Sequence, residues 1–313
     1  MIARNKRVVA GQNIADMDLA EWIDPLSYGA QSVFNKAVRK FVDLAKSDSS
    51  WFGYANTYGL ENILAVFCWS TVNVEIPYRS DTEMFKRADF WLLPSETYST
   101  FKAADCEDST HLLASALENI LLFSDINDPT QYFCCLGYYY DGSYWGHAFI
   151  LWRNKYLEHQ LKPTESYSNK YYVFETTWDE EISPFSWYNW RYESYIPAII
   201  FNRRYCSTTL NADAQSTLGV SQSYIERHKE AIQNMIDYVT TGRLIKESWR
   251  HKTKERMVPM VDGLRIEPKA TWLSRLIGKR KIGRLLRQLS SVSSIRLLRS
   301  RLLGRPKADY LGS

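Results

Sequence analysis

The sequence predicts an α+β fold in which a helix with a cysteine in its first turn packs on an antiparallel sheet, with helical extensions at both ends. An apolar stripe at helical spacing follows Cys106, four aromatic-rich runs with strand character come next, and an Asp-Gly pair separates the first two runs. A helix followed by an antiparallel sheet is an α+β pattern. With 313 residues, the chain suits one large domain or a core domain with an appendage.

The N-terminal part of the chain is predicted to be mainly helical. Apolar residues within the segment 1–50 lie close to helical spacing: Val33, Phe34, Val38, Phe41, Val42 and Leu44. Residues 60–74 form a largely apolar run, which predicts a helix buried against the core. Residues 78–89 are polar and are expected to form a loop.

The segment that begins at Cys106 is predicted to be a helix. Its apolar residues form a single stripe: Leu112, Leu113, Ala116, Leu117, Ile120 and Leu121. Asp105 is a favourable N-cap, and Asp108 is expected to reach back toward it as in a capping box. Residues 125–129 end the helix.

Four strands are predicted at 131–140, 144–152, 170–177 and 195–201, because these runs are dense in Tyr, Trp, Phe, Val and Ile. Asp141-Gly142 predicts a hairpin turn between the first two. In the second strand, the two-residue period places four side chains on one face: Trp145, His147, Phe149 and Leu151.

The C-terminal part changes in composition. Residues 207–222 are rich in Ser, Thr, Ala and Asn and predict a linker, and residues 224–249 predict a helix. Residues 271–305 carry ten Lys and Arg and no acid, so the rest of the chain has 39 − 10 = 29 basic and 35 acidic residues, a net charge of −6. The basic amphipathic tail, residues 271–313, is expected to contact an acidic protein surface, an anionic membrane or nucleic acid.

The composition excludes several classes of protein. A chain that is 45% hydrophobic and 24% charged is not of the disordered type, and no apolar run approaches the roughly 18–20 residues of a membrane span. The basic N-terminus is not followed by the apolar stretch of a signal peptide, so a cytoplasmic location is expected. Five cysteines without a CxxC pair predict neither a disulfide framework nor a zinc clamp.

Three residue types in one order predict thiol chemistry. A cysteine at a helix N-terminus, Cys106, is followed by His147 and then by Glu175, each of the latter on a predicted strand. The helix dipole and an imidazolium lower the pKa of a thiol, and a carboxylate orients the imidazole. The Cys106 backbone N–H is one oxyanion donor, and Trp91 is a candidate for the second. Asp179 is a rival to Glu175 for the orienting acid.

Three carboxylates, those of Asp105, Glu107 and Asp108, lie next to the proposed nucleophile in the sequence. Like charges raise the pKa of a thiol, so these carboxylates need an offset. Backbone capping supplies one, and a hard cation such as Ca²⁺, which takes carboxylate oxygens, supplies another.

The remaining histidines and aromatic residues have simpler interpretations. His111 is expected to be a surface or core residue of the Cys106 helix, whereas three others lie in polar stretches and are expected to be solvated: His159, His228 and His251. A cluster of aromatic residues could line a substrate cleft but is more often part of a core: Trp187, Tyr188, Trp190 and Tyr192.

The residues upstream of the cysteine and those of two strands resemble a known group. Tyr78, Asp81, Asp89, Trp91, Pro94 and Glu96, together with Asp105-Cys106-Glu107-Asp108, are similar to the motif of the bacterial transglutaminase-like cysteine proteinases, of which the LapG periplasmic proteases are best known. Trp145-Gly146-His147-Ala148 and Phe174-Glu175-Thr176-Thr177 resemble the histidine and acid strands of that superfamily. The resemblance covers roughly residues 75–180.

The resemblance implies a papain- or transglutaminase-like core at residues 51–206, between an N-terminal helical segment (1–50) and a linker with a helix (207–270). It implies a Cys106-His147-Glu175 triad and a calcium site at Asp105, Glu107 and Asp108. Trp91 and Trp145 are, separately, the candidates for the oxyanion site or substrate cleft. Three departures stand out. Ala104 replaces a glycine of the motif, and Glu175 replaces its usual Asp. The separation of His147 and Glu175, 175 − 147 = 28 residues, is longer than usual because of an insertion around residues 154–170.

The expected activity is hydrolysis of an amide bond in a protein or peptide through a thioester, for which no cofactor is required and calcium is optional. Acyl transfer to an amine by the same residues is one alternative. A catalytically silent module that binds a partner is another.

Overall fold

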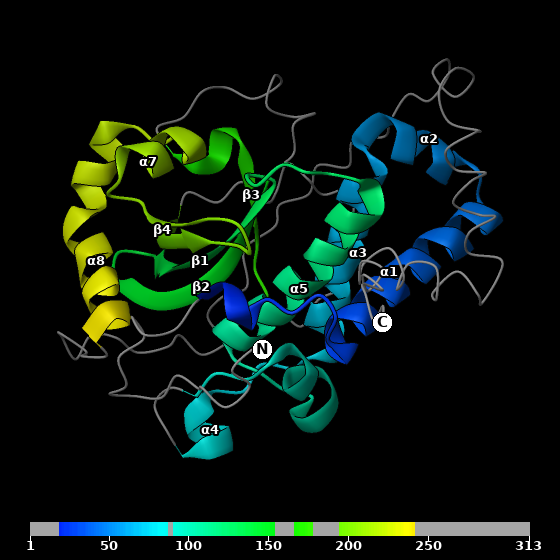
Figure 1. Ribbon diagram of the computed structural model, residues 1–313, viewed down its shortest axis with the longest axis horizontal. Coiled ribbons are helices and arrows are strands. Elements are labelled where there is room, and N and C mark those ends of the chain that lie inside the picture. The colour runs from blue at the N-terminus through cyan, green and yellow to red at the C-terminus, as the bar shows by residue number, and fades with distance from the viewer. Residues whose placement is uncertain (1–18, 87–89, 154–165, 178–193, 242–313) are drawn as a thin grey trace, which may run out of the picture.

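A computed structural model of the protein describes residues 19–86, 90–153, 166–177 and 194–241 (Figure 1). The helical part comes first: η2 (Leu19–Trp22), α1 (Tyr28–Ser47), α2 (Ser50–Tyr58), α3 (Leu60–Glu75), α4 (Asp81–Phe85), η3 (Glu96–Phe101) and α5 (Cys106–Ser124). The sheet and its later helices follow: β1 (Tyr132–Tyr140), β2 (Tyr144–Arg153), η4 (Tyr167–Asn169), β3 (Tyr171–Phe174), β4 (Tyr195–Phe201), β5 (Cys206–Thr208), α7 (Ala212–Leu218) and α8 (Gln222–Thr241). The basic tail and residues 242–270 lie outside the described residues.

The five strands form one sheet in the order β3-β2-β1-β4-β5, and all neighbouring strands are antiparallel. The α+β class is therefore confirmed. The predicted hairpin between β1 and β2 is also confirmed, with Gly142 at the turn in the left-handed region at φ +101°. Glycine adopts this conformation without steric cost, which explains the Asp-Gly pair at this position.

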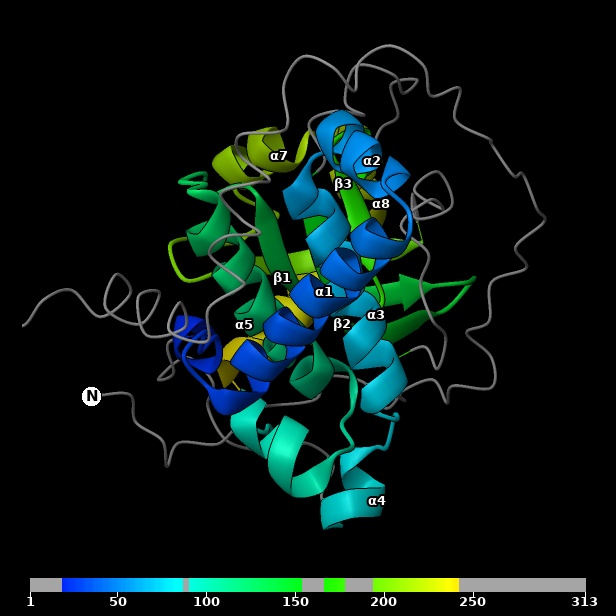
Figure 2. The ribbon, with the colours of Figure 1, turned by 90° about the vertical axis from the view of Figure 1, so that its right-hand side faces the viewer.

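Alternation along the strands divides the core into two clusters. The larger cluster joins one face of the sheet to α1, α3 and α5, which lie side by side (Figures 1 and 2). On β2, Ala148 and Ile150 belong to this cluster, whereas Phe149 and Leu151 belong to the smaller one, which includes residues of α7. The predicted alternation on β2 is therefore confirmed. It places His147 on the same face of the strand as Phe149 and Leu151.

Two segments predicted as irregular contain regular structure. The expected linker at 207–222 is wrong, because it holds the end of β5 and α7. Its Ser and Thr content is typical of linkers, but Ala214 and Leu218 are buried and the Thr209 hydroxyl donates to Pro197 O at 2.8 Å. The expected loop at 78–89 contains α4, which Ser80 and Glu83 start with a capping box.

The helix predicted at 60–74 is confirmed as α3, and the one predicted from Cys106 is confirmed as α5. α1 confirms helical structure within residues 1–50 and shares its core with α3 and α5. Within the described residues, none of the helices has the length and apolarity needed to cross a membrane.

Candidate functional site

Cys106 is the first residue of α5 and has a side chain that is almost fully buried, with 2% of the residue exposed. Asp105 occupies the N-cap position, but its side chain makes no capping hydrogen bond. The predicted capping box is therefore wrong. The Asp108 carboxylate lies elsewhere, since its Oδ1 accepts a hydrogen bond from Leu92 N at 2.5 Å. Asp108 thus holds the backbone at Leu92, before α5, instead of capping the N-terminus of the helix.

His147 and Glu175 form a buried pair, in which His147 Nε2 lies 2.5 Å from Glu175 Oε2. β3 pairs only with Ile150–Arg153 of β2, so His147 lies beyond the end of β3, where the chain turns at Glu175. The other carboxylate oxygen, Oε1, accepts from Thr177 N at 2.9 Å and from Thr177 Oγ1 at 2.6 Å. Both oxygens of Glu175 are therefore held, and the imidazole is oriented by one of them.

Glu175 is fully buried, and burial disfavours its charged form. The charge of His147 and hydrogen bonds from His147, Thr177 and Tyr195 outweigh burial, so the pKa of Glu175 lies below its ordinary value of 4.5. The acid is thus ionised at neutral pH, as an orienting partner of histidine must be.

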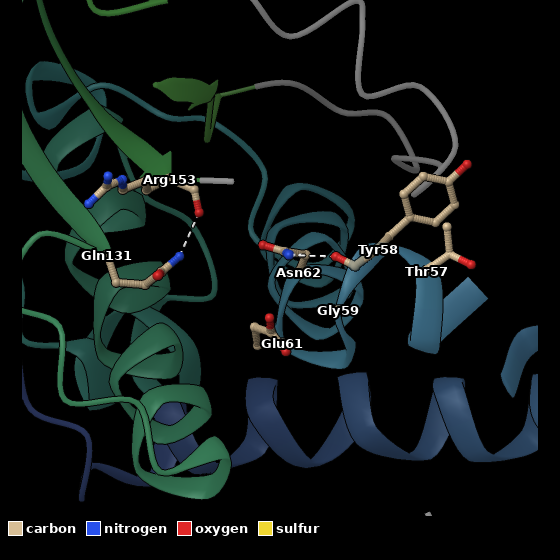
Figure 3. A pocket seen from close by; sticks show the side chains of 7 residues that line it. All are labelled: Thr57, Tyr58, Gly59, Glu61, Asn62, Gln131 and Arg153. Atoms are coloured by element: carbon tan, nitrogen blue, oxygen red, sulfur yellow. Dashed lines mark hydrogen bonds between the residues drawn. The ribbon is translucent and has the colours of Figure 1, made fainter. Parts of the chain in front are cut away.

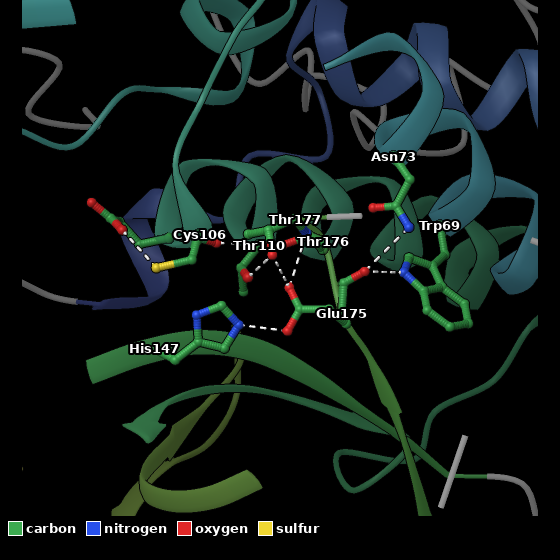
Figure 4. Close-up of polar contacts among 9 residues, drawn as sticks. Trp69, Asn73, Cys106, Thr110, His147, Glu175, Thr176 and Thr177 are labelled. Atoms are coloured by element: carbon green, nitrogen blue, oxygen red, sulfur yellow. Dashed lines mark hydrogen bonds and ion pairs between the residues drawn. The ribbon is translucent and has the colours of Figure 1, made fainter. Parts of the chain in front are cut away.

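Side chains of the helical layer hold the acid from the other side. Trp69 Nε1 and Asn73 Nδ2, both on α3, donate to the Glu175 carbonyl oxygen at 2.5 and 3.2 Å (Figure 4). Thr176 Oγ1 donates to the Cys106 carbonyl oxygen at 3.4 Å. The backbone next to the acid is therefore tied directly to the start of the cysteine helix.

Figure 4 places the imidazole of His147 with Glu175 on one side and the Cys106 sulfur facing its other side. Among the described residues, no hydrogen bond joins this sulfur to His147. Instead the thiol donates to Glu107 Oε2 at 3.3 Å. Burial and then the charges of Glu107 and Asp105 raise the pKa of the Cys106 thiol well above 9.0. In this arrangement the cysteine is therefore a protonated thiol.

Three buried carboxylates meet beside the thiol, because Asp81 of α4, Asp105 and Glu107 offer oxygens that lie within 4.8 Å of one another. Burial and the charges of its acidic neighbours raise the pKa of Asp105 well above 3.8. Asp105 Oδ1 has no hydrogen-bond partner among the described residues. Of the residues that the resemblance implies as calcium ligands, Asp105 and Glu107 belong to this cluster, whereas Asp108 Oδ1 contacts Leu92 N. The sequence interpretation missed Asp81, although Asp81 stands in the motif that carries the resemblance.

The two tryptophans expected near the cleft lie in different surroundings. The Trp91 ring is buried and packs against Trp22 and His111, with ring centroids 5.4 and 4.9 Å apart. Trp145 is partly exposed at the β1–β2 hairpin, and its Nε1 donates to Asp141 Oδ1 at 2.9 Å. Trp145 shares the strand and the face of His147, whereas the Trp91 ring is part of the core.

Two of the other histidines are described. His111 is a core residue, one of the two alternatives expected. The expectation that His228 is solvated is wrong, because it is buried and its Nδ1 lies 2.9 Å from the Tyr144 hydroxyl. The polar residues next to His228 lie on the exposed face of α8, whereas His228 lies on its buried face with Tyr224 and Ile225. Several candidates lie outside the described residues: His159, Asp179, Trp187, Tyr188, Trp190, Tyr192 and His251.

A pocket of about 160 Å³ lies between the start of α3 and the ends of β1 and β2 that are remote from His147 (Figure 3). Its polar side chains are used locally, since Gln131 Nε2 donates to Arg153 O at 2.5 Å and Asn62 Nδ2 donates to Tyr58 O at 2.6 Å. None of the residues that line it belongs to the Cys106 site.

No protein-family model matches the chain, and no curated protein matches it either.

Proposed function

We propose that the protein is a thiol-dependent amide-bond hydrolase with a papain- or transglutaminase-like core, acting on a protein or peptide substrate. The observation that supports this most directly is the buried His147–Glu175 pair at 2.5 Å, with the Cys106 sulfur at the start of α5 facing the imidazole. A nucleophile, a base and an orienting acid from three separate elements converge at one place, which is the arrangement that acyl transfer requires.

In this reaction Cys106 transfers its proton to His147, and the thiolate attacks the substrate carbonyl carbon. The carbonyl π pair moves to oxygen, and the tetrahedral intermediate collapses as the C–N bond breaks. The imidazolium of His147 gives its proton to the leaving amine, which leaves a thioester on Cys106. Water then attacks the thioester while His147 accepts its proton, and the acid product leaves as the thiol is restored.

The raised pKa of Cys106 is the main obstacle to this chemistry, and the carboxylate cluster offers a remedy. Asp81, Asp105 and Glu107 fit a hard cation by their chemistry, and the buried, unpartnered Asp105 Oδ1 fits it too. A Ca²⁺ bound there would supply positive charge next to the thiol and lower its pKa. We therefore propose that Asp81, Asp105 and Glu107 bind a Ca²⁺ ion that activates the Cys106 thiol.

The test is the pH dependence of alkylation of Cys106 by iodoacetamide, read by peptide mass spectrometry with and without Ca²⁺. A Cys206→Ser background removes the exposed cysteine, since the other three cysteines are buried. We expect fast labelling below pH 8 with Ca²⁺, lost in His147→Ala and kept in the matched control His228→Ala. Slow labelling with an ordinary thiol profile in all three proteins would overturn the triad.

One observation favours a second candidate, a catalytically silent module that binds a partner. The Cys106 thiol is buried and donates to Glu107, so its ground state is unreactive. Slow labelling in every condition would support this candidate. If labelling is fast, incorporation of an added amine into a peptide product, compared with cleavage, separates acyl transfer from hydrolysis.

A further inference from the structure

Tyr78 is fixed beside the nucleophile by backbone contacts. It forms a parallel bridge with Ala104, the residue two before Cys106. Arg79 N donates to Ala104 O at 2.9 Å, and Ala104 N donates to Pro77 O at 3.3 Å. The segment that follows α3 is therefore paired directly with the chain that leads into α5.

The Tyr78 side chain is half-buried, and its backbone is paired with the residue two before Cys106. Burial and the negative charges of four neighbours raise the pKa of its phenol: Cys106, Asp105, Glu107 and Glu175. The hydroxyl therefore keeps its proton throughout the pH range in which a thiol enzyme works. Among the described residues, the hydroxyl makes no hydrogen bond, so its proton is available to a ligand.

The chemistry of this hydroxyl, and the pairing of the Tyr78 backbone with the chain that leads into Cys106, match a need that the proposed triad leaves open. Attack on a carbonyl creates an oxyanion, which requires donors besides the Cys106 backbone N–H. Trp91, the donor suggested by the sequence, packs its ring against Trp22 and His111 in the core. A neutral phenol is a suitable donor, because its proton is strongly attracted to a developing alkoxide.

We propose that Tyr78 is a catalytic residue whose hydroxyl donates a hydrogen bond to the substrate carbonyl oxygen as that oxygen becomes negative. This inference rests on the proposed thiol chemistry. Tyr78 keeps its proton throughout: the sulfur–carbon bond forms, the π pair moves to the oxygen that Tyr78 binds, and the pair returns as the C–N bond breaks. The proton that the amine gains comes from His147.

Two reagents separate this role from a structural one, in the full chain with Cys206→Ser. Acylation of Cys106 by p-nitrophenyl acetate passes through an oxyanion, whereas alkylation by iodoacetamide displaces iodide and forms none. We expect Tyr78→Phe to slow acylation by about 10²-fold, as the loss of one oxyanion donor does elsewhere, and to leave alkylation unchanged. Tyr28→Phe, at an exposed site on α1, is the matched control and should change neither rate.

The rates of acylation and alkylation also distinguish failure of the Tyr78 inference from failure of the proposed function. Acylation by Tyr78→Phe at the wild-type rate would overturn the inference, and so would an equal loss of both rates, because the phenol would then act on the thiol or on the fold. Slow alkylation of the wild-type protein would instead overturn the proposed function itself, and the inference would fail with it. Circular dichroism of Tyr78→Phe checks that the variant is folded.

Discussion

At the scale of single residues, Glu107 contacts the proposed nucleophile, Cys106, directly. Its Oε2 accepts the Cys106 S–H hydrogen bond at 3.3 Å, which stabilises the thiol over the thiolate. After burial, its charge is the largest contribution that raises the pKa of Cys106. Glu107, the residue that follows Cys106 in the sequence, therefore disfavours the thiolate form of Cys106.

Glu107→Gln should therefore make Cys106 more reactive, because the amide removes a negative charge next to the sulfur. We expect the rate of iodoacetamide alkylation at pH 7 without Ca²⁺ to rise severalfold. The response to Ca²⁺ should become smaller, since one of its proposed ligands is lost. Glu226→Gln on the exposed side of α8 is the control. A slower rate in Glu107→Gln would show that the carboxylate helps the thiolate instead.

His111 leads to a prediction about pH and stability. Its ring is fully buried against Trp22, Trp91 and Phe201, and neither ring nitrogen has a hydrogen-bond partner among the described residues. Burial lowers the pKa of His111 from 6.5 to about 3. Below pH 6.5 the unfolded chain therefore binds a proton at this position that the folded chain excludes, and stability falls as the pH drops toward 3.

His111→Phe should remove this dependence while keeping an aromatic ring against Trp91. Between pH 8 and pH 5, we expect wild type to lose about 2 kcal/mol more free energy of unfolding than the variant. Urea titrations at both pH values measure the difference, and the other titrating groups cancel in the comparison. Parallel pH profiles for the two proteins would contradict the prediction.

That Cys106, His147 and Glu175 lie together could be predicted because each stands in a local pattern: a helix start for Cys106, and an aromatic run for His147 and for Glu175. The roles proposed for Asp81 and Tyr78 could not be assigned from the sequence, because they depend on contacts with the segment at Ala104–Asp105, far along the chain. Residue type and spacing carry no information on such a pairing. A bridge between two irregular segments has no period that a sequence pattern reveals.

At the scale of elements, composition predicted secondary structure poorly where tertiary contacts determine whether a helix or strand forms. The Ser- and Thr-rich segment after β4 forms β5 and α7 because its few apolar residues are buried and the Thr209 hydroxyl donates to β4. Long apolar runs such as α3 were predictable, since a run of that length has to be buried whatever its partners. Ala104 is accommodated in place of the motif glycine because its φ is not positive.

The end of α5 shows a local conflict that a substitution can relieve. Asp125 adopts φ +56°, a left-handed conformation that favours glycine, and its charge lies at the negative end of the helix dipole. Asp125→Gly should raise the free energy of unfolding by about 1 kcal/mol. Asp125→Ala removes the charge but keeps the Cβ, so it should raise the free energy of unfolding by less than Asp125→Gly does. Thermal unfolding of both variants measures the difference. Equal gains from both variants would exclude backbone strain as the cause.

At the scale of the whole molecule, the candidate site spans two layers. Cys106 starts a helix of the helical layer, whereas His147 and Glu175 belong to the sheet side, so their geometry depends on how the layers dock. Trp69 of α3 links the layers at the site: its ring stacks on Phe174 at 4.6 Å, and its Nε1 donates to Glu175 O at 2.5 Å. Trp152 of β2 links them elsewhere through a 2.8 Å hydrogen bond to Asn62 of α3.

These two tryptophans allow a matched test of whether docking at the site controls reactivity. Phenylalanine at either position keeps an aromatic ring near Phe174 but loses one buried hydrogen bond, which should lower the free energy of unfolding by about 1–3 kcal/mol in both variants. Trp69→Phe should in addition slow acylation of Cys106, because the Glu175 carbonyl oxygen then keeps one hydrogen bond among the described residues, the one from Asn73. Trp152→Phe should leave that rate unchanged. Equal losses of acylation rate in the two variants would mean that reactivity follows overall stability, and that the contact between α3 and Glu175 has no specific part in holding the acid.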